Sequence, residues 1–347
     1  MPHKVRLDPS GGEFSVNSGE TVLAAALRQG IHLPYGCRTG SCGTCRAHLI
    51  SGEIAYPEGP PLALTVLERG YGEAVLCRAV PVTDLVVAAQ EIAAMSALRV
   101  RAFPCRIARM EPLAHDVMAV YLKLPAVSRL GFLPGQYVDV LMADGHRRSF
   151  SLANPPHDDK LLELHVRHVP GGHFTTEVFE KLHEGALLRL QGPLGTFFLR
   201  EDSTRPILMV AGGTGFAPIK AMLRHGWQQG LHREIRFYWG ARARRDLYAD
   251  ELLRGWAASQ PGFHYVPVLS EPRPEDDWSG RTGFVHEAVM SDYADLSGFD
   301  IYLSGPPPMV EAARQTFPVH GADPRRMFSD AFEFAPEVRD ALEQAAR

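Results

Sequence analysis

The sequence of 347 residues has no long apolar run. Stretches such as 85–89 fall far short of the roughly 18 consecutive apolar residues that indicate a membrane-spanning helix. The opening residues, Met-Pro-His-Lys-Val-Arg-Leu-Asp, also lack the cationic start and following apolar stretch that are typical of a secretory signal. The sequence therefore predicts a cytoplasmic protein without a membrane span.

The chain also has no excess of basic residues over acidic ones. The chain has 36 Lys and Arg against 40 Asp and Glu, a net charge of -4, and no basic block or stripe forms. Nucleic acid is therefore not an expected partner. Apolar residues make up 45% and charged residues 22%, which excludes a disordered or fibrous chain. A folded chain of this length is expected to form two or three domains.

Cysteine is scarce and unevenly placed, because four of the 5 cysteines lie in the first 77 residues. In a reducing compartment, such a local cluster indicates metal or redox chemistry rather than disulfides. The spacing is C-x4-C-x2-C followed by a distant fourth cysteine, which is the spacing of plant-type 2Fe-2S ferredoxins. The predicted cluster ligands are Cys37, Cys42, Cys45 and Cys77.

The loop that carries the first three cysteines contains Gly36, Gly40 and Gly43. Glycines allow the backbone N–H groups to turn toward a small anionic cluster. The alternative is a zinc site of four thiolates, but such sites more often have two C-x2-C pairs, and the chain has one. The remaining cysteine, Cys105, stands alone in a predicted strand and is expected to be a small buried apolar residue.

Changes in the local pattern predict three domains, at residues 1–92, 101–200 and 204–347, with 91–97 as a linker. The pattern of the first domain predicts an α+β unit with a hairpin, one helix and short strands. Six short strands with Pro and Gly turns then suggest an antiparallel barrel. From residue 206 strands and helices alternate, which requires a parallel sheet. The barrel strands are expected at 105–109, 117–123, 137–141, 148–152, 162–169 and 187–191. In the last domain we expect strands at 207–210, 235–239, 264–269 and 301–303, and helices at 217–229, 246–258 and 285–291.

Residues 1 to about 90 resemble a plant-type ferredoxin domain of the β-grasp fold. The order ferredoxin, barrel, nucleotide sheet resembles the single-chain oxygenase reductases of the ferredoxin-NAD(P) reductase superfamily. Leu-Pro-Tyr-Gly-Cys at 33–37 and GPLGTFFLRED at 192–202 are similar to stretches of the bacterial CDP-6-deoxy-3,4-glucoseen reductase group. The resemblance covers essentially the whole chain, and it implies a 2Fe-2S cluster, FAD and NADH as cofactors.

In the barrel, Arg148-Ser149-Phe150-Ser151 resembles the family's R-x-Y-S flavin motif, with Phe in place of Tyr. The resemblance implies that the arginine pairs with the flavin pyrophosphate, that the aromatic ring lies along the isoalloxazine and that Ser151 bonds near the reactive ring edge. Taken alone, the tetrapeptide also fits an ordinary strand of alternating character. The family's P-G-Q-Y is intact at 134–137.

A second barrel motif lies between a strand and a helix expected at 175–182. Gly171, Gly172 and Thr175 are expected to offer N–H groups and a hydroxyl to a phosphate, with Arg167 just before them. His165 and His168 stand three residues apart on a strand and therefore point to opposite faces, so we expect no metal site there.

The nucleotide motifs follow two predicted strands of the last domain. After 207–210, the turn of Gly212, Gly213, Thr214 and Gly215 precedes a helix, where glycines allow a pyrophosphate to approach the backbone. After 301–303, the sequence resembles the family's C-G-P-P-P-M nicotinamide motif. Its expected contact residues are Ser304, Gly305, Pro306 and Met309.

Two further features bear on catalysis. Ser304 stands where the family has cysteine, so hydride transfer is expected to be slower or differently aligned. Near the carboxyl end, the stretch 328–334 resembles the segment from which an aromatic residue approaches the flavin, and we choose Phe332. The alternative is that these phenylalanines anchor a terminal strand.

Together the motifs predict a reductase that passes electrons from NADH through FAD to the cluster and on to a partner. The partner is a terminal oxygenase of a multicomponent system or a deoxysugar dehydrase. A non-catalytic redox sensor or scaffold with the same cofactors is the alternative from another class. NADH is expected over NADPH by resemblance, although Arg242, Arg244 and Arg245 near the ribose position favour a 2′-phosphate and Asp246 opposes one.

Overall fold

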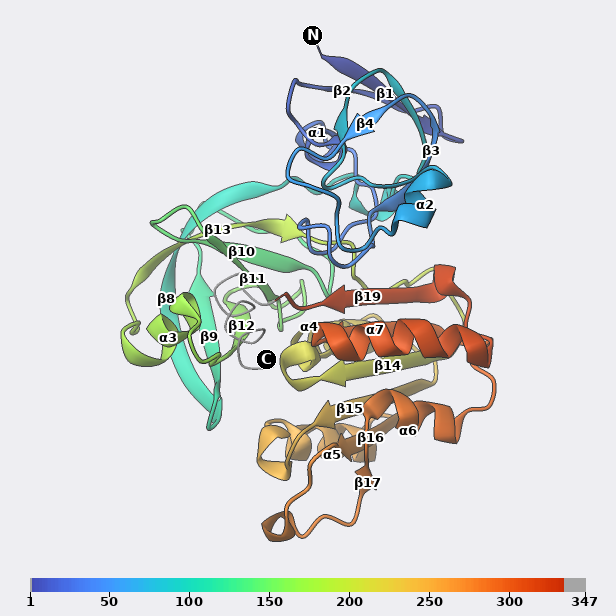
Figure 1. Ribbon diagram of the computed structural model, residues 1–347. Helices are drawn as coiled ribbons and strands as arrows, with labels where there is room; N and C mark the ends of the chain where they lie inside the picture. The colour runs from blue at the N-terminus through green and yellow to red at the C-terminus, as the bar shows by residue number, and fades with distance from the viewer. Residues whose placement is uncertain (1, 334–347) are drawn as a thin grey trace. The chain divides into compact units, whose positions relative to one another are not determined.

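The computed structural model of the chain describes residues 2–333. Contacts divide it into two compact units, which we describe separately (Figure 1). The first consists of residues up to Val100 together with Pro193–Thr196, and the second of Arg101–Gly192 together with the chain from Phe197 onward. None of the helices in the described part of the chain is long and apolar enough to cross a membrane.

The first unit is a mixed sheet with a helix packed on it. Strand β1 (His3–Asp8) pairs antiparallel with β2 (Glu13–Val16) and parallel with β7 (Leu85–Ala88), and the full strand order is β2-β1-β7-β3-β5. In β1 the residues Val5 and Leu7 are buried and their neighbours exposed, as period-two alternation predicts. The other elements are α1 (Val22–Arg28), β3 (Arg46–Ser51), β4 (Ile54–Ala55), α2 (Val66–Gly70), β5 (Glu73–Val75), β6 (Val80–Pro81) and η1 (Ala93–Met95).

The first half of the second unit is a six-stranded antiparallel sheet of order β11-β10-β13-β8-β9-β12. A bridge between Leu152 and Leu164 joins its two edges and closes it into a barrel around an apolar core. Strand β8 is much longer than the sequence predicts, and two register shifts against β9 let it bend around the barrel. The elements are β8 (Arg101–Ala114), β9 (Val117–Lys123), β10 (Tyr137–Leu141), β11 (Arg147–Ser151), β12 (Leu162–Arg167), α3 (His173–Glu180) and β13 (Leu187–Leu194).

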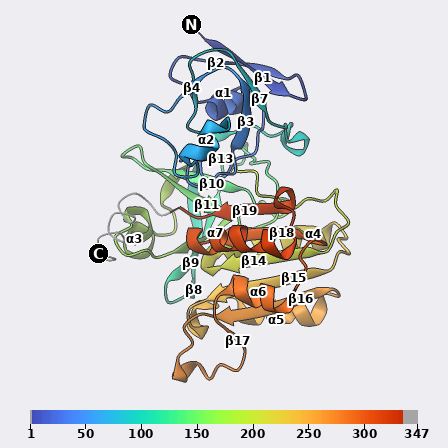
Figure 2. The ribbon, with the colours of Figure 1, turned by 45° about the vertical axis from the view of Figure 1, so that its right-hand side comes forward.

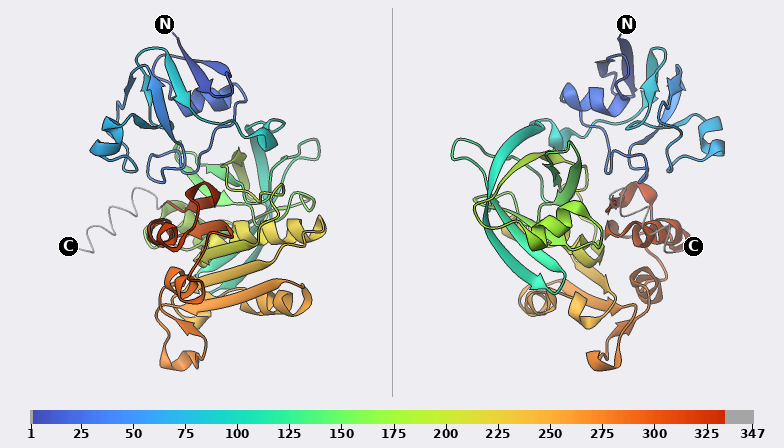
Figure 3. Two further views of the ribbon diagram at one scale, coloured as in Figure 1. Left: turned by 90° about the vertical axis from the view of Figure 1, so that its right-hand side faces the viewer. Right: turned by 60° about the vertical axis from the view of Figure 1, so that its left-hand side comes forward.

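The second half is a parallel sheet of order β17-β16-β15-β14-β18-β19 with helices on both faces (Figures 2 and 3). Alternate residues of β14 face opposite ways: Ile207 and Met209 pack toward α4 and α5, and Leu208 and Val210 toward α6 and α7. The strands are β14 (Ile207–Gly212), β15 (Ile235–Ala241), β16 (Phe263–Leu269), β17 (Arg281–Thr282), β18 (Asp300–Gly305) and β19 (Met327–Ala331). The helices are α4 (Phe216–Gln228), α5 (Asp250–Ser259), α6 (Val285–Asp292) and α7 (Pro307–Thr316), with short η2 (Gly213–Gly215), η3 (Arg244–Asp246), η4 (Pro274–Asp276), η5 (Phe317–His320) and η6 (Pro324–Arg326).

Several elements differ from the prediction. The helix expected from residue 246 begins at Asp250, because residues 244–246 form the separate turn η3. Helix α7 was not predicted, although prolines in the first helical turn suit a helix start. In the predicted linker, Met95 is fully buried, so this stretch is partly packed rather than open.

Candidate cofactor sites

The four cysteines near the amino end come together in the first unit. The backbone N–H of Cys37 donates to Sγ of Cys42 at 3.4 Å, and the N–H of Cys42 donates to Sγ of Cys37 at 3.4 Å. The thiols of Cys37, Cys45 and Cys77 lie close enough to shift one another's pKa. Bonds from Cys42 and Cys77 lower the pKa of the Cys37 thiol, so it readily becomes the thiolate that metal binding requires.

The fold explains how the distant cysteine reaches the loop. Cys45 directly precedes β3 and Cys77 closely follows β5, and these two strands pair antiparallel. Gly36 lies so close that an added Cβ would stand 3.3 Å from Sγ of Cys42, and Gly40 has a φ of +89° that favours glycine. Four soft thiolates, three from one tight loop and the fourth from the segment after β5, fit an iron–sulfur cluster. By contrast, Cys105 is buried in β8, which raises its thiol pKa to about 12.

The predicted flavin motif occupies β11. The Ser149 hydroxyl donates to the buried Asp139 at 2.7 Å, so this side chain serves the barrel. The Phe150 ring packs against Phe174 of α3, with centroids 5.3 Å apart. Arg148 is half-buried and donates one bond to the carbonyl of the preceding residue at 2.9 Å.

The three residues predicted to act in catalysis gather from distant parts of the chain. The Ser151 hydroxyl donates to Asp330 of β19 at 3.2 Å, and Ser304 of β18 stands opposite Asp330 in the sheet register. The Phe332 N–H donates to the carbonyl of Gly305 at 2.8 Å. Asp330 was not identified from the sequence as a site residue. Its position in the stretch 328–334, two residues before Phe332, is the feature that could have indicated it.

The Ser304 hydroxyl itself is fully buried and has no hydrogen-bond partner among residues 2–333. A buried hydroxyl without a partner costs free energy, on the order of 1–3 kcal/mol. A polar ligand group beside Ser304 would remove that cost, so the residue suits the nicotinamide amide that the motif implies.

The two nucleotide motifs of the parallel sheet lie against each other. A Cβ on Gly215 would stand 2.1 Å from the carbonyl oxygen of Ser304, and one on Gly305 would stand 2.6 Å from that of Gly212. A Cβ on Gly212 would likewise meet Sδ of Met309 at 2.9 Å and the ring of Pro306 at 2.8 Å. The glycines are therefore needed for close packing of the two turns at the carboxyl ends of β14 and β18.

The turn between β12 and α3 differs in detail from the expectation. The Thr175 hydroxyl donates to the carbonyls of Val169 and Gly172, both at 3.2 Å, so it closes the turn. Gly171 has a φ of +79°, and Gly172 caps the helix. An adjoining depression of about 380 Å³ is lined by Gly171, Gly172, His173, Thr176, Glu177 and Lys181.

Arg167 points to the nucleotide half of the unit. A Cβ on Gly213 would stand 2.7 Å from its guanidinium, so Arg167 lies against the glycine-rich turn. Its Nε donates to Asp116 at 2.7 Å. His165 is buried and His168 packs on Phe179, which agrees with opposite faces of the strand.

The residues near the expected ribose position differ in their exposure to solvent. Arg242, Arg244 and Arg245 are exposed, and Arg244 donates to the carbonyl of Asp276 at 3.1 Å. Asp246 is only 7% exposed and accepts from the N–H of Ala243 at 3.0 Å. This hydrogen bond holds the η3 turn, so the carboxylate is not turned outward to a ribose.

A thiolate cluster in a ferredoxin-type sheet, an antiparallel barrel and a parallel nucleotide sheet in one chain define an iron–sulfur flavoprotein reductase. Family models agree: residues 5–82 match the 2Fe-2S iron-sulfur cluster binding domain, 104–199 the oxidoreductase FAD-binding domain and 209–315 the oxidoreductase NAD-binding domain.

Curated relatives match over nearly their full length. The chain is 40% identical over 332 residues to the CDP-6-deoxy-L-threo-D-glycero-4-hexulose-3-dehydrase reductase of Yersinia pestis, covering 96% of this chain and 99% of the relative. It is 35% identical to the phenol 2-monooxygenase reductase component DmpP of Pseudomonas sp., covering 97% and 96%. The solved structure of the Amycolatopsis cytochrome P450 reductase GcoB superposes with a TM-score of 0.79 at 35% identity, covering 95% of this chain and 98% of that one.

The chain therefore belongs to the family of single-chain, ferredoxin-domain reductase components with FAD- and NAD-binding domains. It is an oxidoreductase that carries electrons from a nicotinamide nucleotide through FAD and a 2Fe-2S cluster to a partner enzyme. The predicted fold class and enzyme class are confirmed, as are the 2Fe-2S cluster, FAD and a nicotinamide nucleotide as cofactors, and the sensor alternative has no support from these relatives.

Proposed function

We propose specific roles for the residues that the fold brings together. Cys37, Cys42, Cys45 and Cys77 hold the cluster. The FAD contacts come from Arg148, Phe150, Ser151, Gly171 and Gly172, and the nucleotide contacts from Arg167, Gly212, Gly213, Thr214, Gly215, Gly305, Pro306 and Met309. The hydroxyls of Ser149 and Thr175 were also expected to contact FAD, but they bond within the barrel half and are not assigned this role. Domain limits at 1–92, 101–200 and 204–347 fit this division of roles.

One set of contacts supports the proposed site of the reaction. Ser151 of the barrel donates a hydrogen bond to Asp330 of β19, Asp330 is the register partner of Ser304 in β18, and the Phe332 N–H donates to the carbonyl of Gly305, the residue after Ser304. When bound, the flavin supplies two-electron acceptance from the nicotinamide and one-electron delivery to the cluster. The protein's part is to hold the two rings in contact at this meeting point and to exclude water, because alignment of reacting atoms supplies much of the rate.

For the partner, we propose a deoxysugar dehydrase. The support is the 40% identity to the Yersinia pestis dehydrase reductase over nearly the whole chain. An oxygenase is the second candidate, supported by the 35% identity and TM-score of 0.79 with GcoB. We propose that the reaction takes place in the cytoplasm, where thiols stay reduced.

The partner is tested by comparing two acceptor enzymes in separate assays. The purified holoenzyme is offered the hexulose dehydrase served by the Yersinia relative or the phenol hydroxylase served by DmpP, each with its own substrate. We expect turnover of the dehydrase to be at least about tenfold faster, a difference of roughly 1.4 kcal/mol. Cytochrome c reduction by the same preparation checks that the relay is intact. Faster turnover of the hydroxylase would reverse the assignment.

For the electron donor, we propose NADH. One support is the match to an NAD-binding domain. The other is that Arg244, one of the three arginines near the expected ribose position, donates a hydrogen bond to the backbone carbonyl of Asp276 and is therefore drawn away from a 2′-phosphate. The measurement is the ratio of kcat/KM for NADH and NADPH in flavin reduction, and NADH is expected to have the larger value. A preference for NADPH of more than about tenfold, roughly 1.4 kcal/mol, would contradict the proposal.

A further inference from the structure

Strand β12 (Leu162–Arg167) carries a row of polar residues, of which the proposed cofactor contacts include only Arg167. Glu163, His165 and Arg167 are two residues apart and therefore share one face of the strand. We call these three residues the β12 stripe. Glu163 is 4% and His165 is 5% exposed. Buried polar groups are costly unless they are paired, so their partners show what the stripe does.

Every member of the stripe has a partner from the nucleotide half of the unit. Glu163 accepts a hydrogen bond from the ammonium of Lys220 in α4. Nδ1 of His165 lies 2.9 Å from the hydroxyl of Tyr248. Arg167 stands 3.8 Å from the carboxylate of Asp246 in η3. The three pairs follow the strand in order, so they fix the alignment of the two halves along it.

The protonation states of Tyr248, His165 and Glu163 give each hydrogen bond between them one donor and one acceptor. Burial raises the pKa of Tyr248 and lowers that of His165, so the phenol keeps its proton and the imidazole is neutral. Burial alone would raise the pKa of Glu163, but the bond from His165 and the Lys220 ammonium outweigh it and lower the pKa to about 2. Because the Glu163 carboxylate only accepts, Nε2 of His165 donates to it at 3.0 Å and Nδ1 accepts from Tyr248.

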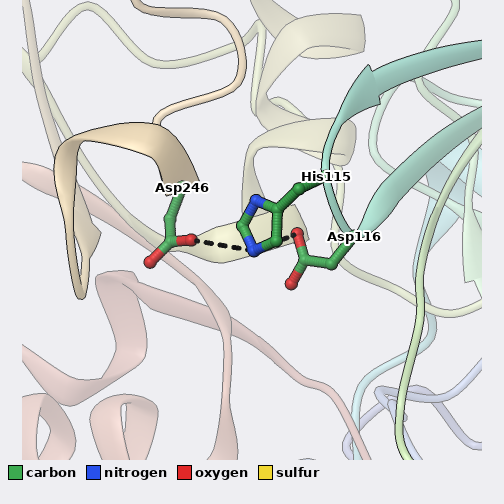
Figure 4. A group of neighbouring side chains, drawn as sticks. All are labelled: His115, Asp116 and Asp246. Atoms are coloured by element: carbon green, nitrogen blue, oxygen red, sulfur yellow. Dashed lines mark ion pairs between the residues drawn. The ribbon is translucent and has the colours of Figure 1, made fainter.

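The end of the stripe is an ion-pair group that spans both halves (Figure 4). Nε2 of His115 stands 3.8 Å from Asp116 of the barrel and 3.7 Å from Asp246 of the nucleotide half. Arg167 lies between the same two carboxylates, at 2.7 Å and 3.8 Å. The single guanidinium offsets one of the two carboxylate charges, and each carboxylate has a basic neighbour within 4 Å, so we interpret the group as a salt-bridge network.

The anchors of the stripe adjoin the nucleotide motifs. Lys220 lies in the first turns of α4, directly after the glycine-rich turn, and the Arg167 guanidinium rests on Gly213. Tyr248 also packs edge-on against Trp239, whose indole N–H donates to the Gly213 carbonyl at 2.9 Å. A shift of the pairs on β12 would therefore move the turn that approaches the nucleotide.

We propose that the β12 stripe is a positioning element that holds the nucleotide half in register with the flavin barrel and so aligns the nicotinamide for hydride transfer. This inference rests on the proposed roles of Ser151 and Ser304. It assigns to Glu163, His165, Lys220 and Tyr248 an effect on the rate of flavin reduction rather than on cofactor affinity, since none of them belongs to the proposed cofactor contacts.

The test compares two Tyr→Phe substitutions that each remove one hydroxyl from the same network. Tyr248→Phe removes the bond across the two halves, and Tyr121→Phe removes a bond to Glu163 from within the barrel, at 3.4 Å. Stopped-flow reduction of the holoenzyme by NADH gives the limiting rate and the dissociation constant separately. We expect Tyr248→Phe to lower the limiting rate about tenfold, with the dissociation constant within about twofold of the parent. Tyr121→Phe is expected to match the parent in both.

A second readout does not depend on turnover. Hydrogen–deuterium exchange of the peptides that cover 162–167 and 244–249 is expected to be faster in Tyr248→Phe and unchanged in Tyr121→Phe. Parental rate and exchange in Tyr248→Phe would overturn the proposal, as would equal losses in both variants. If the parent flavin is not reduced by NADH at all, the proposed function fails, and the exchange comparison still decides whether the stripe aligns the two halves.

Discussion

Replacing Cys42 with serine is expected to remove the 2Fe-2S cluster and to lower NADH-dependent cytochrome c reduction by at least about 100-fold. A serine hydroxyl stays protonated at neutral pH and is a harder donor than a thiolate, so it binds iron poorly. Sγ of Cys42 lies beside the backbone of the cysteine loop, since it accepts from the N–H of Cys37 and an added Cβ on Gly36 would stand 3.3 Å from it. Direct reduction of ferricyanide by the flavin is expected to continue, because the barrel and nucleotide sheet form a separate unit.

The measurements are the visible absorption bands, the iron content and the paramagnetic signal of the reduced cluster. Cys105→Ser is the matched control, because this thiol belongs to the second unit, where it is buried in β8 and bonds to the carbonyl of Leu188 at 3.6 Å. It is expected to keep the full iron content. A full reduced-cluster signal in Cys42→Ser would show that the ligand set is wrong.

Arg148→Ala is expected to weaken FAD binding by about 1.5 to 3 kcal/mol, which is roughly a ten- to hundredfold loss of affinity. The physical reason is the loss of a charge-assisted hydrogen bond to the flavin pyrophosphate. Arg148→Lys keeps the charge without the planar fork and is expected to fall between the parent and the alanine variant. Fluorescence titration of the apoprotein with FAD gives the dissociation constants.

The control for this substitution is the preceding residue of the same strand. Arg147 is exposed, and its side chain donates to Gln191 at 2.8 Å. Adjacent strand residues point to opposite faces, so Arg147→Ala is expected to leave FAD affinity within about twofold of the parent. Unchanged FAD affinity in Arg148→Ala, or equal losses in both variants, would refute the role of Arg148.

Features that depend on near neighbours in the chain were readable from the sequence. The spacing of Cys37, Cys42 and Cys45 lies within one loop, and a glycine-rich turn directly after a buried strand is a local pattern. Alternating strands and helices predicted the parallel sheet for the same reason, since periodicity is a property of short windows. Helix α7 was missed because its prolines were interpreted as part of a binding motif.

Side-chain partners from distant segments were decided only by the tertiary structure. The sequence allowed Asp246 to face a ribose and Thr175 to face a phosphate, but packing turned the first inward and closed the second onto its own loop. The pairing of Ser151 with Asp330, and of His165 with Tyr248, joins residues far apart along the chain. Residue spacing determines which face of a strand a side chain occupies, whereas the group it meets there depends on how the complete elements pack against one another.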